Sequence, residues 1–419
     1  MLPTLKNPAP SDTICIQHIS GFSRSFSMSK YHSTVFSQLL HFIPKDEFSQ
    51  LVGQHQGDRY TKSCTSWNQL VLQLYAQATN KQSLRDIETS ISLDPGTHHH
   101  LGINTIARST LSYANNTRSS EIFEGLFYAT LKQCQSVVPK GQFTFDQPLY
   151  SLDSTTIKLC LSLCTWASYT QHKGALKLHT LLNNDSMLPE LIMPTTGKTG
   201  DITAAKQMKL TKQLKKGSML VFDRAYNDYT WWQELTNAGI TLVARSKQNQ
   251  SFVVSERLVC DPGTGVLKDE LVTHVIYPGA SPLKQPLRQV TFYDSDTEKT
   301  ITFITNNTEL PAATIAAIYK QRWQIELFFK WIKQNLKIKT FLGTSENAVR
   351  TQIWIAMLYY LLLSYIKYQT KFSKTLLTLT RMVGATLLNR RPLIDLLSLT
   401  PQTIHRFKPP PKLQPRLGF

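Results

Sequence analysis

The sequence has 419 residues, of which 41% are hydrophobic, and it carries a formal net charge of +18 with a pI of about 9.6. This length allows two or three domains, and the hydrophobic content excludes wholesale disorder. The charge indicates a polyanionic partner, with nucleic acid as the leading interpretation and a merely basic surface as the alternative. Residues 319–419 hold seventeen Lys or Arg and three acidic residues, a balance of +14, so most of the excess lies near the C-terminal end.

The N-terminal third of the chain divides into an unpatterned segment and a helical one. Residues 1–30 lack periodicity, which predicts a flexible segment, and Met28 is a candidate for the true start. Apolar residues recur at helical spacing over 31–136, with Pro- and Gly-containing turns between the runs. We therefore predict a compact helical domain over 31–136.

Strands and helices alternate in the next part of the sequence. In chain order the patterns predict a strand over 149–159, a hairpin over 177–195, a helix over 201–215, a strand over 218–226, a helix ended by Gly239 and a strand over 240–247. Short strands and glycine turns over 250–306 then predict a β-rich insertion. The series favours a mixed α/β sheet within a domain spanning 145–370.

The last part of the chain is helical and basic. The apolar run 353–366 spans fourteen residues, which is short for a membrane span and predicts a buried helix. Residues 371–419 are expected to form a basic helical segment and a Pro-rich tail. Six cysteines are scattered without metal-site or disulfide spacing, which favours a reducing cytoplasm. The short apolar run predicts no membrane partner.

One amphipathic helix, predicted over 318–341, gathers polar groups on a single face. At about 100° per residue, five side chains fall within an arc of roughly 80°: Tyr319, Arg322, Glu326, Lys330 and Lys333. A solvated helix usually spreads or pairs its charges. A lone carboxylate among three cations and a tyrosine instead indicates a surface that holds a polyanion near one fixed acid.

Three acids are candidates for chemistry. Asp153 lies in the middle of a predicted strand and Asp223 follows the apolar run of another. Adjacent strands can bring two such carboxylates to one sheet edge, and Glu326 on a helix across that edge would be the third. Carboxylate oxygens suit Mg²⁺ or Mn²⁺, and two such ions would support an in-line phosphoryl displacement. The alternative is that each acid only caps an element or pairs with a neighbouring cation.

The helix resembles the Y-x2-R-x3-E-x6-K signature of the IS4 family of bacterial DDE transposases, which Tyr319, Arg322, Glu326 and Lys333 match without gaps. The stretches "SLDSTTIKL" and "VFDRAYNDYTWWQELTNAGITLVARSK" are similar to the two aspartate blocks of that family. The opening "HSTVFSQLLHFIPKDEF" is similar to the helical N-terminal domain of one branch. The resemblance covers nearly everything from about residue 30 to about residue 370.

The resemblance implies an RNase H-like catalytic core in which Asp153, Asp223 and Glu326 are the ligands of divalent metal ions. It further implies that Tyr319, Arg322 and Lys333 contact phosphates of the transposon end, while Lys330 is added from helix geometry alone. The implied reaction is nicking to a 3′-hydroxyl and strand transfer, by a homodimer on double-stranded DNA in the bacterial cytoplasm.

Some details stay open on the sequence alone. Family members can stack a flipped base on an insertion-domain tryptophan, but residues 250–318 contain no Trp, and Tyr277, Phe292 and Tyr293 are the substitutes considered. Within the helical domain, Arg85, Arg108 and Arg118 are candidate DNA contacts, the alternative being a domain that only packs and dimerises. Rival functions are a nuclease without strand transfer, an inactive DNA-binding relic, and a membrane-associated basic protein.

Overall fold

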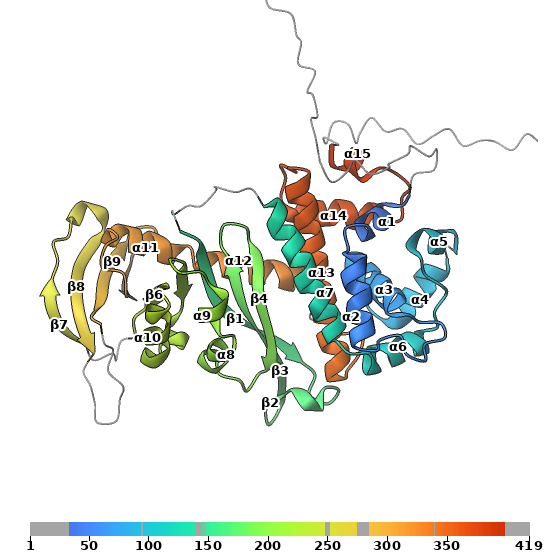
Figure 1. The fold of residues 1–419 in the computed structure, drawn as a ribbon, viewed down its shortest axis with the longest axis horizontal. Helices are drawn as coiled ribbons and strands as arrows, with labels where there is room; N and C mark the ends of the chain where they lie inside the picture. Colours follow the sequence, from blue (N-terminus) through green and yellow to red (C-terminus); the bar gives the residue numbers. More distant parts are fainter. Residues whose placement is uncertain are drawn as a thin grey trace, which may run out of the picture.

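The structure, a computed structural model, describes residues 33–93, 95–138, 145, 147–247, 252–274, 285–338 and 340–398. The predicted flexible N-terminus with Met28, the candidate Tyr277 and the Pro-rich tail lie outside the described residues. Figure 1 shows an elongated arrangement, with a β-rich end, a central α/β part and a helical end.

Ten described strands form one sheet in the order β2-β3-β1-β5-β6-β10-β9-β8-β7, with β4 paired to β3. Their bounds are β1 Leu149–Leu159, β2 Ser168–Thr170, β3 Lys173–Asn183, β4 Leu188–Thr196, β5 Met219–Phe222, β6 Thr241–Arg245, β7 Phe252–Arg257, β8 Val266–His274, β9 Leu287–Asp294 and β10 Lys299–Thr305. Strands β4, β3 and β1 form an antiparallel meander, and β5 and β6 continue it parallel to β1. This order is that of an RNase H-like core, so the predicted fold class is confirmed.

The β-rich insertion is confirmed, and it is part of the central sheet. Strand β10 pairs antiparallel with β6, and β9, β8 and β7 add to it in turn. A buried ion pair ties β8 to β9, with Arg288 Nη2 at 2.7 Å from Asp269 Oδ2. The alternation of apolar and polar residues predicts the strands of the insertion but not the earlier strand with which they pair, because pairing depends on long-range contacts.

Two predicted helical features differ from the structure. The helix expected over 201–215 is two short helices, α8 Asp201–Gln207 and α9 Leu210–Gln213, because Lys209 adopts a left-handed backbone with φ of 48°. Helix α10, Tyr229–Asn237, ends as expected before Gly239, whose φ of 71° suits glycine. The long helix expected over 318–341 is also divided, into α11 Ala312–Lys320 and α12 Trp323–Asn335.

The helical end of the molecule joins both ends of the chain (Figure 1). Its elements are α1 Val35–Leu40, α2 Lys45–Gln54, α3 Ser66–Ala78, α4 Leu84–Ser92, α5 His98–Leu101, α6 Arg108–Thr117, α7 Glu121–Val137, α13 Glu346–Gln369, α14 Leu376–Thr386 and α15 Leu393–Ser398. Ser or Thr side chains cap several N-termini, as their sequence positions predict. Helix α13 shares one hydrophobic core with α1–α7 and α12.

Helix α13 contains the apolar run 353–366. It is long and apolar enough to cross a membrane, but 89% of its apolar window is buried within the protein. It lies alongside α7 and also contacts α3, α6 and α14. The interpretation of this run as a buried core helix is therefore confirmed.

Candidate active site

Strand pairing brings two of the predicted acids to the same place. Leu152 of β1 pairs with Phe222 of β5, and Asp153 and Asp223 are the residues that follow them. Asp153 accepts a hydrogen bond from the backbone N–H of Ser154 at 2.7 Å, and Asp223 accepts one from the N–H of Ala225 at 2.8 Å. Because β1 and β5 are parallel, Asp153 within β1 lies beside the end of β5, where Asp223 follows.

The third acid comes from the junction of two helices. Between α11 and α12 the backbone tightens to i→i+3 hydrogen bonds, with Gln321 N–H donating to Ile318 O and Arg322 N–H to Tyr319 O. Tyr319 therefore lies in the last turn of α11, whereas Glu326 lies in the first turn of α12. The prediction of one straight helix is wrong, since apolar periodicity does not reveal a local tightening of this kind, but Tyr319 still lies beside Arg322.

Arg322 lies between the acids at this junction. Its Nη1 is 3.5 Å from Asp153 Oδ2, and its Nη2 donates to Glu326 Oε1 at 2.5 Å. The guanidinium also lies 5.8 Å from the ring centroid of Tyr319, and that ring packs at 4.7 Å on the ring of Phe303. Tyr319 and Phe303 thus support the position from which Arg322 reaches two carboxylates.

The electrostatics of Asp153 show that the acids influence one another. Burial raises the pKa of Asp153 to about 6, and the charges of Asp223 and Glu326 act in the same direction. The Ser154 N–H and the Arg322 guanidinium oppose this increase. Three carboxylates separated by 70 and 103 residues in the sequence therefore share one electrostatic environment.

The donor chemistry of this site suits a hard divalent cation. Across the described ranges, no three acidic, His or Cys side chains are close enough together to hold an ion as they stand. Instead, a guanidinium occupies the space between Asp153 and Glu326, so a cation is already accommodated there. Asp153, Asp223 and Glu326 supply oxygen ligands of the kind that Mg²⁺ and Mn²⁺ prefer, provided that Arg322 withdraws.

Helix α12 carries the remaining predicted DNA contacts away from the acids. Lys330 is exposed one turn beyond Glu326, and Lys333 is half-buried in the following turn. The exposed side chains of Trp323 and Leu327 border the same stretch. The helix therefore presents a basic and partly apolar strip that begins at the carboxylates.

A polar network that sequence reasoning missed supports β1 behind Asp153. Asp201, the first residue of α8, accepts from Ser154 Oγ at 2.6 Å and from Lys177 Nζ at 3.2 Å. His179 Nδ1 lies 3.6 Å from the same carboxylate, and burial lowers the pKa of this histidine to about 4. An acid at a helix start resembles an ordinary N-terminal residue, so the sequence held no signal for this network.

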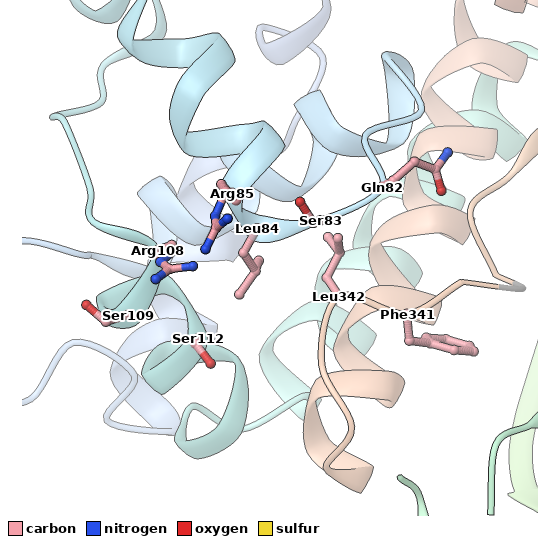
Figure 2. A pocket seen from close by; sticks show the side chains of 9 residues that line it. All are labelled: Gln82, Ser83, Leu84, Arg85, Arg108, Ser109, Ser112, Phe341 and Leu342. Carbon is pink, nitrogen blue, oxygen red and sulfur yellow. The ribbon is translucent and has the colours of Figure 1, made fainter.

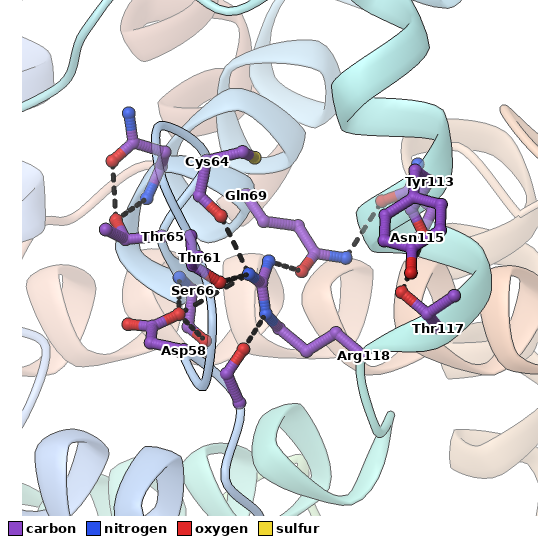
Figure 3. Close-up of polar contacts among 12 residues, drawn as sticks. Asp58, Thr61, Cys64, Thr65, Ser66, Gln69, Tyr113, Asn115, Thr117 and Arg118 are labelled. Carbon is purple, nitrogen blue, oxygen red and sulfur yellow. Dashed lines mark hydrogen bonds and ion pairs between the residues drawn. The ribbon is translucent and has the colours of Figure 1, made fainter.

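The three candidate arginines of the helical region have different environments. Arg85 and Arg108 are exposed, whereas Arg118 is only 7% exposed. Arg118 donates to the carbonyls of Gly57 and Cys64 and to Gln69 Oε1, and it pairs with Asp58 (Figure 3). The prediction of Arg118 as a DNA contact is wrong, because its donors are already used to hold the segment between α2 and α3 against α6.

Arg118→Ala is expected to lower the free energy of unfolding by about 3 kcal/mol, since it leaves several buried acceptors unpaired. Urea denaturation measures this loss. Arg108→Ala is the matched control because Arg108 is exposed, and we expect its stability to stay within about 0.5 kcal/mol of the wild type. Equal stabilities for the two variants would contradict the structural role of Arg118.

Two of the three stacking candidates in the β-rich insertion can be placed. Phe292 is half-buried and packs beside the hydrophobic cluster of β9, β10 and α11. Tyr293 on β9 is 42% exposed. Exposure thus favours Tyr293 over Phe292 as an accessible ring, and the role of either as a base-stacking residue stays a prediction.

An RNase H-like sheet that carries three convergent acids beside a basic helix defines an enzyme of nucleic-acid strand cleavage and joining. The family described as "Transposase DDE domain" matches residues 144–362, more than half of the sequence, and the chain belongs to this family. It is therefore a transposase, as its resemblance to the IS4 family indicates, and the family depends on divalent metal. Residues 31–104 match a domain of unknown function, DUF4372.

Known relatives have names of the same kind. The chain is 37% identical to a protein of Sinorhizobium fredii named as transposase y4zB, over 57% of this chain and 67% of the relative. It is 27% identical to the protein named as transposase of insertion sequence element IS5377 of Geobacillus stearothermophilus, over 81% and 86%. It is 23% identical to the protein named as transposase of element IS4SA of Synechocystis sp., over 67% and 78%.

Proposed function

We propose that this transposase performs cut-and-paste transposition, cleaving double-stranded DNA at the inverted-repeat ends of its element and joining those ends to a target. The observation that carries the proposal is the position of Arg322, whose guanidinium reaches both Asp153 and Glu326. Two carboxylates from β1 and α12, which are far apart in the sequence, thus contact the same cationic group. A basic strip suited to DNA begins beside them.

Asp153, Asp223 and Glu326 are proposed as the metal ligands. Mg²⁺, or Mn²⁺, bound as two ions would supply activation of the attacking hydroxyl and stabilisation of the leaving oxygen. In the first reaction a water oxygen bonds to phosphorus as the P–O3′ bond at the transposon end breaks, which leaves a 3′-hydroxyl. In the second, that hydroxyl attacks a target phosphodiester and displaces its 3′ oxygen.

The cationic side chains of this region would bind and orient the DNA backbone. Arg322, once released from the acids, can donate two parallel hydrogen bonds to a phosphate. Tyr319 would keep the guanidinium of Arg322 near the scissile phosphate. Lys330 and Lys333 would contact phosphates farther along α12. These contacts neutralise the charge that the phosphate carries during displacement.

Transposition requires two ends to be held together, so we propose a homodimer on DNA as the active assembly. The relatives from bacteria support a site of action on the nucleoid in the bacterial cytoplasm. The net charge of +18 suits this setting, because it favours binding to long DNA at any sequence before the ends are found.

The test of this function is a cleavage and joining assay on DNA that carries the inverted repeats flanking the element. Wild-type protein and Glu326→Ala are compared with Mg²⁺, with Mn²⁺ and with EDTA. Joined products that require the metal and vanish in the variant are expected. Cleavage without joining would identify a nuclease instead, and DNA binding without chemistry would identify a relic.

A further inference from the structure

A groove on the helical part of the protein lies outside the carboxylate site. Its volume is about 690 Å³, and its walls come from the start of α4, the start of α6 and residues 341–342 (Figure 2). None of its lining residues is an acid. In a chain with an excess of positive charge, an open groove of this composition indicates an anionic ligand.

Two arginines dominate the polar lining of the groove. Arg85 and Arg108 belong to different helices, yet their side chains lie close to each other in Figure 2. The nearby acids are turned to backbone groups: Asp86 Oδ2 accepts from the N–H of Ser83 at 2.9 Å, and Glu88 Oε1 accepts from the N–H of Arg108 at 2.9 Å. The two guanidinium groups are therefore available to an anion that enters from solvent.

Hydroxyl and apolar groups complete the walls. Ser109 and Ser112 of α6 lie on the same side as Arg108, whereas Phe341 and Leu342 form the opposite side (Figure 2). Two guanidinium groups with hydroxyls on one wall suit phosphate oxygens, and an apolar wall suits deoxyribose. This combination matches a stretch of sugar-phosphate backbone better than it matches a free phosphate, which would leave most of the open volume unfilled.

The opposite wall of the groove is a direct continuation of the catalytic helix. Glu326 to Asn335 spans roughly 14 Å at 1.5 Å per residue, and six further residues add at most about 20 Å before Phe341. The two places are thus at most about 34 Å apart, which is within one turn of B-DNA. Gln352 of α13 fixes this segment, accepting from the N–H of Leu342 at 2.8 Å and donating to Lys337 O at 2.6 Å.

We propose that this groove binds the phosphodiester backbone of the same duplex whose end lies at the carboxylates, within one helical turn of the scissile bond. The proposal rests on the proposed function for the identity of the duplex. Its ligand is recognised by charge and backbone shape rather than by base sequence. The groove would thereby hold the helical part of the protein and the catalytic helix in a fixed relation to one DNA segment.

The test measures binding without chemistry. A fluorescein-labelled 40-base-pair duplex of random sequence is titrated by anisotropy in EDTA at several salt concentrations, with wild type, Arg85→Ala/Arg108→Ala and the control Lys62→Ala/Lys132→Ala. The control removes two exposed cations of the helical part outside the groove. We expect the groove variant to bind roughly tenfold more weakly at 100 mM salt, with a slope of log K against log salt that is shallower by about 2.

Ser112→Trp provides a second variant, since it fills the groove without changing the charge. It should weaken binding and flatten the slope in the same way, while circular dichroism confirms a native helix content. Equal effects of the groove and control double variants, with no effect of Ser112→Trp, would overturn the proposal and leave the transposase assignment intact.

A small-anion site is distinguished by a thermal-shift measurement with inorganic phosphate in place of DNA. Phosphate stabilisation that disappears in Arg85→Ala/Arg108→Ala, combined with unchanged DNA binding, would also overturn the proposal. Failure of the wild type to bind any duplex would instead contradict the proposed function itself.

Discussion

Asp153→Asn is expected to lower the rate of DNA cleavage by at least about 10³-fold and, at the same time, to make the metal-free protein more stable. Cleavage is lost because the amide cannot supply the negative oxygen ligand proposed for this position. Stability increases because Asp153 is mostly buried beside Asp223 and Glu326, where its negative charge is unfavourable without a bound ion. One substitution should thus separate the requirements of function from those of folding.

The gain in stability depends on pH in a defined direction. The folded-state pKa of Asp153, about 6, lies above its ordinary value of 3.8, so the folded protein binds this proton more tightly than the unfolded chain. Wild-type stability therefore falls as pH rises from 3.8 to 6, and the cost is fully present above pH 6. The shift corresponds to at most about 3 kcal/mol, which Asp153→Asn should recover at pH 7–8 but not below pH 4.

Urea denaturation of both proteins in EDTA, at pH 4 and at pH 7.5, measures this difference. Asp296→Asn is the control, because that carboxylate forms an exposed ion pair with Lys320 at the turn after β9. It should change neither cleavage nor stability appreciably. A destabilised Asp153→Asn at pH 7.5 would show that the carboxylate is held favourably in the absence of metal, against the direction given by burial.

The positions of Asp153 and Asp223 illustrate what this sequence could predict. Asp153 follows the first apolar residues of β1 and Asp223 follows the apolar strand β5, and parallel pairing of these strands makes the two residues neighbours. The order of elements along the chain is also predictable, since the periodicity of each strand and helix is visible within its own short stretch of sequence. This is why the RNase H-like class and the first two acids were predictable together.

Other features depend on contacts that no local pattern encodes. Arg118 resembles Arg85 and Arg108 in the sequence, and only the packing of α6 against the segment before α3 makes it a buried structural residue. Lys209 interrupts a helix that periodicity would continue. The joining of β10 to β6 is likewise a long-range choice. These differences arise where tertiary contacts decide among local conformations that are similar in energy.

The most informative residue of the site is Arg322. Its resemblance to the family signature predicts a contact with a DNA phosphate, whereas the structure shows ion pairs with Asp153 and Glu326. If its guanidinium stands in for a divalent ion before DNA binds, Arg322→Ala should bind Mn²⁺ at least about tenfold more tightly in the absence of DNA. The reason is Coulombic: opposite charges about 4 Å apart interact by about 4 kcal/mol near a protein surface, and the variant removes that competitor from two carboxylates. Isothermal titration calorimetry measures the affinity without reference to activity.

The same variant should cleave DNA at least about 10²-fold more slowly, because a phosphate donor that acts during displacement is lost. Arg322→Lys, which keeps the charge but cannot donate as a planar fork, should show wild-type Mn²⁺ affinity with reduced cleavage. Lys330→Ala, one turn beyond Glu326, controls for the removal of any cation from α12 and should leave Mn²⁺ affinity nearly unchanged.

Tighter metal binding with slower cleavage in Arg322→Ala would show that Arg322 pairs with the carboxylates before DNA binds and with a DNA phosphate afterwards. Weaker metal binding in Arg322→Ala would show instead that the arginine organises the carboxylates, and the exchange would have to be abandoned.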